Sequence, residues 1–246
     1  MTDKVKMRII GSGGIFVADA SASTLIDDSI LIDCGAGTFK QLLRLNCDVG
    51  KISTIVITHL HADHFMDVPF MMLAARKNID NGQKLTIFVP EGGVKATHEI
   101  AKYIWNPEDA TESWWPQNVE VVEYKNGESF TANGATIEPV KVVHGKVRAS
   151  GFIVEKAGKR IGFSGDSIMC DGIQKIVEAS DWAVLDTSFP KSGSAIHMGL
   201  DDIYGLCNTY PDKKIIATHI FEETRKMIRR NIPNLIVPND GDIFEL

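Results

Sequence analysis

The segment His59–His64, with the sequence HLHADH, constrains this chain more than any other. It holds three histidines and one aspartate within six positions. The residues before it, 52–57, are apolar and β-branched, as in a buried strand, and those after it, through residue 74, are typical of a helix. As neutral core residues, these side chains would need many hydrogen-bond partners. Such a dense set at a strand-to-helix turn therefore indicates a site of chemistry.

The spacing within this segment indicates two metal ions side by side. His59 and His61 are two residues apart, so an extended or turning backbone directs both side chains to one side. Asp63 and His64 stand where the helix begins and can reach a second point nearby. We therefore expect each half of the segment to contribute ligands to a different ion.

Further candidate ligands follow strand-like stretches elsewhere in the chain. Residues at the ends of several strands can converge on one edge of a sheet, so these candidates can join the first segment in one site. They are His144 after residues 140–143, Asp166 after residues 160–164, His197 in the loop after residues 182–186, and His219 after residues 214–218. His98, the remaining histidine, lies within a helix-like stretch, and we interpret it as a surface or packing residue.

Strands alternate with helices in each half of the chain, which predicts an α/β fold. No linker, repeat or low-complexity tract interrupts the pattern, so we expect one domain over residues 1–246. The segment from Trp105 to Trp115 breaks the alternation with three tryptophans, and we expect a projecting loop there. Predicted strands are 7–10, 23–26, 30–33, 54–57, 85–89, 119–123, 136–143, 151–154, 160–163, 182–185 and 214–217; predicted helices are 38–45, 67–75, 92–104, 172–179, 200–209 and 222–230.

Composition sets limits on partners and location. With 44% hydrophobic and 24% charged residues, the chain is typical of a globular protein. No apolar run approaches the roughly 20 residues of a membrane helix, so no membrane association is expected. The N-terminus lacks a signal-peptide pattern and the four cysteines are scattered, as expected for a cytoplasmic protein with reduced thiols. A net charge of −6 argues against a stable nucleic-acid complex.

Motifs spread from about residue 7 to the C-terminus resemble the metallo-β-lactamase superfamily. These are HxHxDH at 59–64, the single His144, Gly165-Asp166, the late Thr218-His219, and the early blocks Gly11-Ser12-Gly13-Gly14 and Leu31-Ile32-Asp33-Cys34-Gly35. The resemblance implies a four-layer αβ/βα sandwich, the metallo-β-lactamase fold, which periodicity alone does not specify.

The resemblance also implies a role for each candidate ligand. Imidazole and carboxylate groups suit zinc, with manganese as the alternative. Two such ions activate water and stabilise both the attacking and the leaving oxygen of a phosphodiester. The superfamily pattern assigns His59, His61 and His144 to one ion, Asp63, His64 and His219 to the second, and Asp166 to a bridge between them.

Three features resemble the ribonuclease Z-like phosphodiesterase branch of the superfamily. Asp166 stands where zinc β-lactamases carry a cysteine. Only 22 positions separate His144 from Asp166, an interval in which ribonuclease Z carries a long arm that grips tRNA and in which this chain has room only for a β-hairpin. His197 occupies the place of a histidine proposed to protonate the leaving oxygen. The resemblance thus gives catalytic roles to Asp63 and His197.

The sequence therefore predicts a small enzyme of this branch without the arm, similar to the anti-Pycsar cyclic nucleotide phosphodiesterases. The expected reaction is hydrolysis of 3′,5′-cyclic mononucleotides, such as cCMP, cUMP, cAMP and cGMP, to nucleoside monophosphates, as in enzymes that counter cyclic-nucleotide immune signalling. The resemblance also implies a homodimer.

Other readings stay open. One is an RNA-processing endonuclease like ribonuclease Z, which the short interval and acidic charge oppose. Another is a catalytically silent member that binds a ligand or partner, which the complete set of seven ligand positions opposes. A β-lactamase or a glyoxalase-type thiolesterase is less favoured still.

Overall fold

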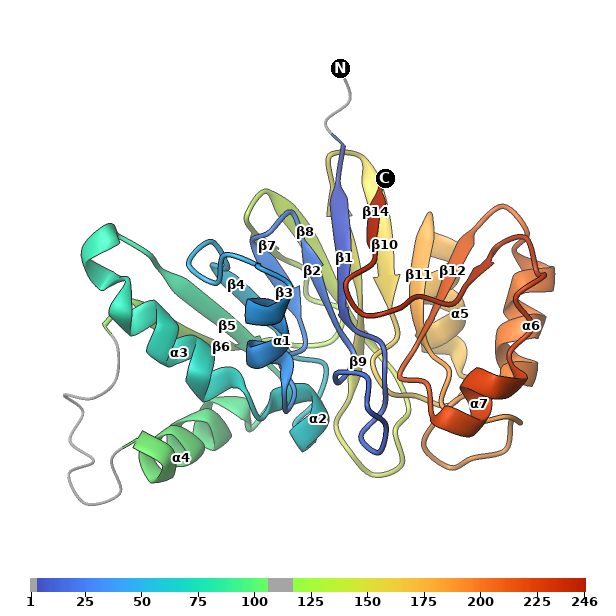
Figure 1. Cartoon of the computed structure of the whole chain (residues 1–246), viewed down its shortest axis with the longest axis horizontal. Coiled ribbons are helices and arrows are strands. Elements are labelled where there is room, and N and C mark those ends of the chain that lie inside the picture. The colour runs from blue at the N-terminus through green and yellow to red at the C-terminus, as the bar shows by residue number, and fades with distance from the viewer. Residues whose placement is uncertain (1–3, 106–116) are drawn as a thin grey trace.

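Two seven-stranded mixed sheets pack face to face, with helices on both outer sides (Figure 1). This arrangement is seen in the computed structural model, which describes residues 4–105 and 117–246. The predicted four-layer αβ/βα sandwich is therefore confirmed. The segment expected to project as a loop lies, apart from Trp105, outside the described residues.

The first sheet is built from the N-terminal half of the chain and the last strand. Neighbouring strands pair antiparallel from β14 through β1 and β2 to β3, and they pair parallel from β3 through β4 and β5 to β6. In spatial order the strands are β14 (Ile243–Glu245), β1 (Lys6–Gly11), β2 (Ser23–Ile26), β3 (Ile30–Ile32), β4 (Thr54–Val56), β5 (Leu85–Val89) and β6 (Val119–Glu123).

The second sheet repeats this plan with the C-terminal half. Strands β7 to β10 pair antiparallel, and β10 to β13 pair parallel. In spatial order they are β13 (Leu235–Ile236), β12 (Lys214–Thr218), β11 (Trp182–Asp186), β10 (Lys159–Phe163), β9 (Ser150–Lys156), β8 (Ala135–Lys141) and β7 (Phe130–Ala132).

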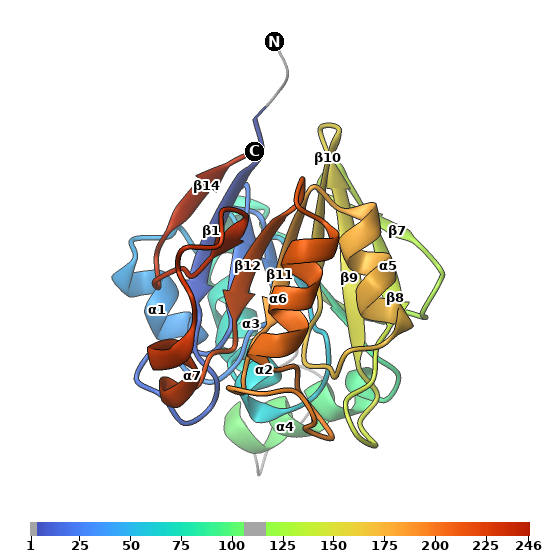
Figure 2. The ribbon, with the colours of Figure 1, turned by 90° about the vertical axis from the view of Figure 1, so that its right-hand side faces the viewer.

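Each sheet has its own helices on its outer side. Figure 2 shows α5 and α6 across the second sheet, and α1, α3 and α4 lie on the side of the first sheet in Figure 1. The short α2 follows β4 directly. The helices are α1 (Thr38–Arg44), α2 (Ala62–Phe65), α3 (Val68–Lys77), α4 (Gly93–Trp105), α5 (Asp171–Ala179), α6 (Leu200–Thr209) and α7 (Glu222–Met227), with a 3₁₀ turn at Ile79–Asn81. None of the described helices has the length and apolar composition needed to cross a membrane.

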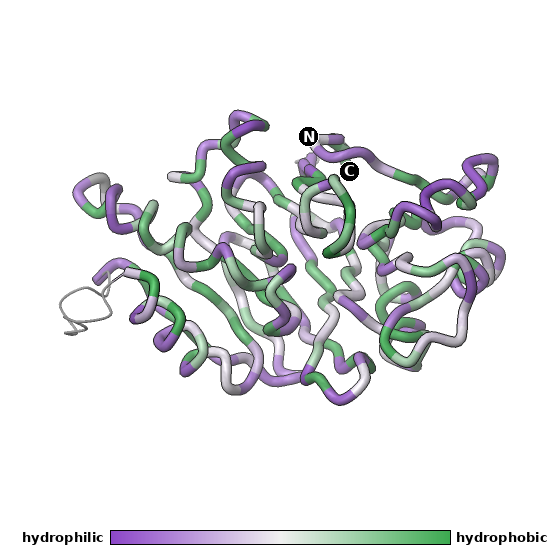
Figure 3. Tube along the Cα trace, turned by 60° about the horizontal axis from the view of Figure 1, so that its bottom comes forward, coloured by the Kyte–Doolittle hydropathy of each residue, from purple (hydrophilic) through white to green (hydrophobic). Residues whose placement is uncertain are grey.

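Three apolar clusters join the four layers. One lies between the two sheets, where Phe152 and Ile161 meet Met7 and Ile30. The other two lie between each sheet and its helices. Apolar segments run through the interior strands and polar segments through the outer turns in Figure 3. Burial of apolar surface thus holds the two sheets in a fixed position relative to each other.

The strands that precede the candidate ligands end at one edge of the sandwich. In the second sheet, β10, β11 and β12 run parallel, and β8 runs in the same direction because two antiparallel pairings separate it from β10. In the first sheet, β3 and β4 are also parallel. The carboxyl ends of parallel strands form the usual crevice for a ligand.

The packing of α5 on the second sheet depends on a glycine. A Cβ atom at Gly162 would lie 2.5 Å from Ile176 Cγ2 and 2.6 Å from Ser180 Oγ. We predict that Gly162→Ala destabilises the protein by about 1–3 kcal/mol, because α5 must move outward. Urea denaturation measures the change.

Gly205 provides the matched control. It lies within α6, is exposed, and has nothing within 4 Å of an added Cβ. Gly205→Ala should stabilise the protein by roughly 0.5–1 kcal/mol through lower backbone entropy in the unfolded chain. Equal effects of the two substitutions would contradict the packing argument.

Candidate metal centre

The structure brings all seven predicted ligands together at the carboxyl edge of the two sheets. They form two groups, and within each group one ligand atom from every residue lies within 4.8 Å of the others. The groups are His59, His61, His144 and Asp166, and Asp63, His64, Asp166 and His219. Asp166 belongs to both, as its predicted bridging role requires. His98, by contrast, is exposed on α4, as expected.

The ligands stand where strands end. His219 follows β12 directly and has φ = 55°, and Asp33, which follows β3 directly, has φ = 60°. Residues other than glycine seldom adopt this left-handed conformation, which costs free energy and is found mainly where function requires it. Both strands therefore turn abruptly at the centre, where the turn brings His219 into the ligand group and Asp33 against Nδ1 of the ligand His64.

Gly35 explains why the Asp33-Cys34-Gly35 block accompanies the histidine segment. A Cβ atom at Gly35 would lie 1.7 Å from the carbonyl oxygen of Asp63. The backbone at Gly35 thus passes directly against α2, where Cys34 N donates to His64 O at 2.8 Å and Ala36 N donates to Ala62 O at 3.0 Å. These bonds fix α2, and with it Asp63 and His64.

The hydrogen bonds around His59 determine its tautomer. The hydroxyl of Thr58 donates to Asp33 Oδ2 at 2.9 Å, so it must accept from His59 Nδ1, which is 3.0 Å away. His59 Nε2 therefore carries a lone pair. This atom is fully buried and has no hydrogen-bond partner among the described residues.

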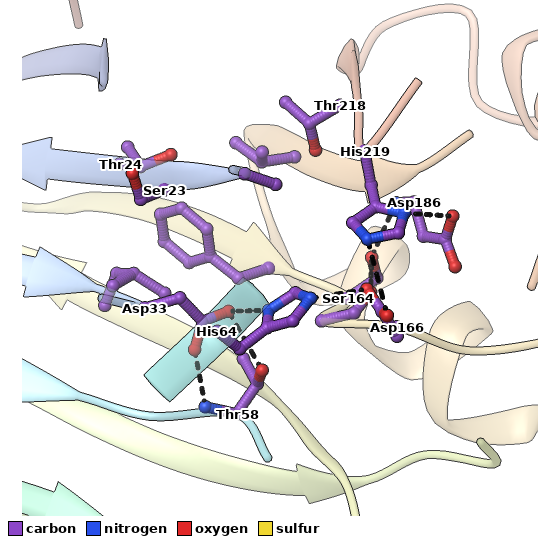
Figure 4. A pocket seen from close by; sticks show the side chains of 15 residues that line it. Ser23, Thr24, Asp33, Thr58, His64, Ser164, Asp166, Asp186, Thr218 and His219 are labelled. Carbon is purple, nitrogen blue, oxygen red and sulfur yellow. Dashed lines mark hydrogen bonds and ion pairs between the residues drawn. The ribbon is translucent and has the colours of Figure 1, made fainter. Parts of the chain in front are cut away.

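The same reasoning assigns His64 and His144. His64 Nδ1 donates to Asp33 Oδ2 at 2.8 Å, so in the neutral ring Nε2 presents a lone pair to Asp166 Oδ1 at 3.2 Å. Figure 4 shows Asp33 between Thr58 and His64, beside a small internal cavity of about 30 Å³. His144 Nδ1 donates to the carbonyl of Ile196 at 2.7 Å, and its Nε2 faces His61 Nδ1 at 3.2 Å.

His219 completes the pattern. Ser188 Oγ donates to Asp186 Oδ1 at 2.6 Å and so accepts from His219 Nδ1 at 2.8 Å. His219 Nε2 then faces the carboxylates of Asp63 at 3.2 Å and Asp166 at 3.6 Å. In four of the ligand histidines, an oxygen outside the centre holds the proton on Nδ1 and leaves Nε2 for the centre. Metal-ligating histidines are oriented in this way.

The buried charges require a positive partner at this place. Burial works toward a higher pKa at Asp166, but His219 and His64 outweigh it and hold this pKa well below its ordinary value. Burial alone would lower the pKa of His64, whereas the carboxylates of Asp166 and Asp33 raise it well above its ordinary value. Converging lone pairs and buried carboxylates repel one another unless a proton or a metal ion lies between them. The donor set therefore fits two divalent cations.

His197 lies beside the centre and forms a dyad with Asp186. Its Nδ1 donates to Asp186 Oδ2 at 2.8 Å and is 3.8 Å from Asp166 Oδ2. Asp186, the last residue of β11, also accepts from Ser188, so one buried carboxylate orients both His197 and the ligand His219.

The sequence did not predict functional roles for Asp33 or Asp186. Both lie at the end of a predicted strand, beside parallel strands that carry ligands. This position alone could have marked them as candidates for the site. Their partners lie 31 and 11 positions away in the chain, so no local pattern links them.

A pocket of about 530 Å³ opens onto the centre. It exposes His61, Asp63, Asp166, His197 and His219 to a ligand, within the usual size range for small-molecule sites.

A sequence model of the beta-lactamase superfamily domain matches residues 28–220, which include all seven ligands. The chain belongs to the metallo-β-lactamase superfamily. The resemblance predicted from the motifs is thereby confirmed at the level of the superfamily.

Proteins similar in sequence are named ribonuclease Z. One from Mycobacterium bovis is 27% identical over 176 residues, which cover 66% of this chain and 62% of that protein. The chain thus matches less than two thirds of this relative's length. Another, from Exiguobacterium, is 23% identical over an alignment that covers 96% of this chain and 97% of the relative.

Solved structures share the fold of this superfamily member over nearly its whole length. The metallo-beta-lactamase fold protein YhfI from Bacillus subtilis has a TM-score of 0.80 at 18% identity, covering 99% of this chain and 100% of that one. A diphosphatase from the PhnP family has a TM-score of 0.77 at 22% identity, covering 100% of this chain and 98% of that one. Zn²⁺-bound PqqB from Methylobacterium extorquens has a TM-score of 0.74 at 12% identity, covering 98% of this chain and 100% of that one.

Because there are two ligand groups, we predict that each binds one ion and that damage to one group removes only that ion. The zinc-loaded protein should hold about two ions per chain, and His61→Ala should hold about one, because His61 belongs to only one group. Zinc should also raise the melting temperature of the metal-free protein, since it binds only the folded site. Elemental analysis and thermal denaturation measure these changes.

His98→Ala is the control and should keep both ions. A His61→Ala protein with an unchanged metal content would contradict the assignment of His61.

Proposed function

We propose that this chain is a dinuclear metal phosphodiesterase that opens 3′,5′-cyclic nucleotides to nucleoside monophosphates. The observation that carries the proposal is the His197–Asp186 dyad beside Asp166, the carboxylate shared by both ligand groups. A poised proton donor next to a two-metal site suits a reaction in which a poor leaving group, an alkoxide, must depart.

Zinc is the proposed metal, held by the seven residues of the two groups. Their imidazole and carboxylate atoms suit this ion, and a structural neighbour is a Zn²⁺-bound protein. When bound, the ions supply activation of water and stabilisation of charge on the phosphate oxygens.

The residues of the chain divide the remaining work. His197 Nδ1 is held by Asp186, so Nε2 is the ring atom that can give a proton to the departing ribose oxygen. The carboxylate of Asp186, 2.8 Å from Nδ1, holds the ring in this orientation. Asp63 lines the pocket with Oδ2 directed to His219, which leaves Oδ1 to orient the attacking water.

A small substrate fits this site better than a folded RNA. The interval between His144 and Asp166 consists of the hairpin β9–β10 and short turns, and the chain carries a net charge of −6. A pocket of about 530 Å³ has the size expected for a ligand such as a mononucleotide. A structural neighbour named as a diphosphatase supports phosphorus chemistry on this fold.

RNA processing is the second candidate function, because the relatives in sequence are named ribonuclease Z. This function would use the same centre and the same proton donor. Cleavage of a pre-tRNA at its 3′ side, at a rate above that for cyclic nucleotides, would favour it. A homodimer and a role against cyclic-nucleotide immune signalling stay predictions.

We predict that the zinc- or manganese-loaded protein hydrolyses at least one of cAMP, cGMP, cCMP and cUMP, with the 5′-monophosphate as product. Chromatography of the products measures the reaction, and a linear dinucleotide, a 2′,3′-cyclic phosphate and a pre-tRNA complete the panel. His61→Ala is the inactive control. Absence of turnover for all four cyclic nucleotides would exclude this substrate class.

The proton-donor role of His197 predicts an effect that depends on the leaving group. His197→Ala should lower kcat for a cyclic nucleotide by roughly 10²–10⁴-fold. It should have little effect on bis(p-nitrophenyl) phosphate, whose leaving group departs without a proton. Asp186→Asn should follow the same pattern more weakly, and His98→Ala should leave both rates unchanged. Equal losses on both substrates would instead assign His197 a structural role.

A further inference from the structure

The pocket over the metal centre is divided between ionic and apolar surfaces. Its polar side chains all belong to the centre or its proton donor. Its other side chains are apolar: Ile15, Phe16, Ala62, Phe189, Ile196 and Phe221. No lysine, arginine, asparagine, glutamine, serine or threonine lines the pocket among the described residues. A ligand that fills it needs an anionic end for the centre and an apolar remainder.

One wall of the pocket is a continuous aromatic surface. The ring centroids of Phe189 and Phe221 lie 5.5 Å apart, and Phe221 is 5.8 Å from His219. His197 lies 5.7 Å from Phe189 and is stacked on His219 at 5.1 Å. The proton donor and one metal ligand are thus part of the same wall as the phenylalanines.

Phe16 also lines this pocket, but its side chain is 86% exposed. Ile15 beside it is 50% exposed. Apolar rings of this size gain free energy when they leave water. An exposed phenylalanine at the entrance of a ligand pocket is therefore placed to be covered by the ligand.

The loop that carries Phe16 is firmly anchored at its base. Asp240 accepts hydrogen bonds from Ser12 N, Ser12 Oγ and Ala20 N at 2.8–3.0 Å, so it joins the two ends of the loop. Arg225 binds Asp19 at 2.8 Å and Ser12 Oγ at 2.9 Å.

Gly14 brings the same loop against the aromatic wall. A Cβ atom there would lie 2.5 Å from the ring of Phe221 and 3.3 Å from that of His219. The backbone two residues before Phe16 is thus held at a fixed place beside the centre.

We propose that Phe16 stacks on the base of the nucleotide whose phosphate lies at the metal centre, and that stacking rather than hydrogen bonding recognises the base. This inference rests on the proposed function and names how its substrate class is selected. Every base presents a π-face, so stacking on an aromatic side chain tolerates different bases. The absence of polar side chains from the described lining, apart from the centre, leaves no side-chain donor or acceptor that could discriminate among them.

Binding measurements separate this proposal from catalysis. Isothermal titration calorimetry on the zinc-loaded full chain compares AMP, CMP and ribose 5-phosphate, which share the phosphate and sugar and differ in the base. We expect AMP and CMP to bind about tenfold to a hundredfold more tightly than ribose 5-phosphate. Phe16→Ala should bring this ratio close to one, and Phe16→Trp should preserve it.

Tyr103→Ala is the matched control, because Tyr103 is an aromatic residue on α4 that is 73% exposed and does not line the pocket. It should keep the wild-type ratio. Equal affinities of the wild-type protein for AMP and ribose 5-phosphate would overturn the proposal, as would a ratio that Phe16→Ala leaves intact. Failure of the proposed function is a different result: the base-dependent affinity is present, but cyclic nucleotides are not hydrolysed.

Discussion

The buried carboxylate of Asp166 is the constraint around which the site is organised. It is 2% exposed, lies within reach of both ligand groups, and has imidazole nitrogens from both sheets directed toward it. Burying a lone negative charge here would cost several kcal/mol of free energy, and protons on its neighbours are a poor substitute for divalent cations. The fold solves this by bringing the ends of four strands, β4, β8, β10 and β12, to one edge, so that ligands distant in the chain share one small volume.

A second layer of oxygens makes the ligand set specific. Asp33, Thr58, Ser188 and the carbonyl of Ile196 fix which ring nitrogen carries the proton, and so which one faces the centre. Asp186 extends this layer to His197. Because one carboxylate binds His197, the proposed proton donor, and, through Ser188, the candidate ligand His219, these two parts of the site are mechanically and electrostatically connected.

The fold class and the ligand positions were predictable because they follow strong local patterns. Apolar β-branched runs marked the long strands, and the ligands stand at their ends. The two-residue β13 and the four-residue α2 were missed because neither stands within an apolar run long enough to be assigned, whereas the equally short β3 and β4 do. Asp186 and Phe16 were missed for another reason. Their importance comes from neighbours in the folded structure, and an aspartate at a strand end or a phenylalanine in a glycine-rich loop has no distinctive sequence context.

The anchoring of the Phe16 loop has a consequence for how the protein is made. Asp240 lies 228 positions after Ser12, and Arg225 lies 213 positions after it. During synthesis, the loop therefore leaves the ribosome well before Arg225 and Asp240, its two anchoring partners. The metal ligands from the first sheet are subject to the same delay, because His219 comes 156 positions after Asp63. The pocket thus forms late in folding, because a nascent chain has no complete site until His219, Arg225 and Asp240 have left the ribosome.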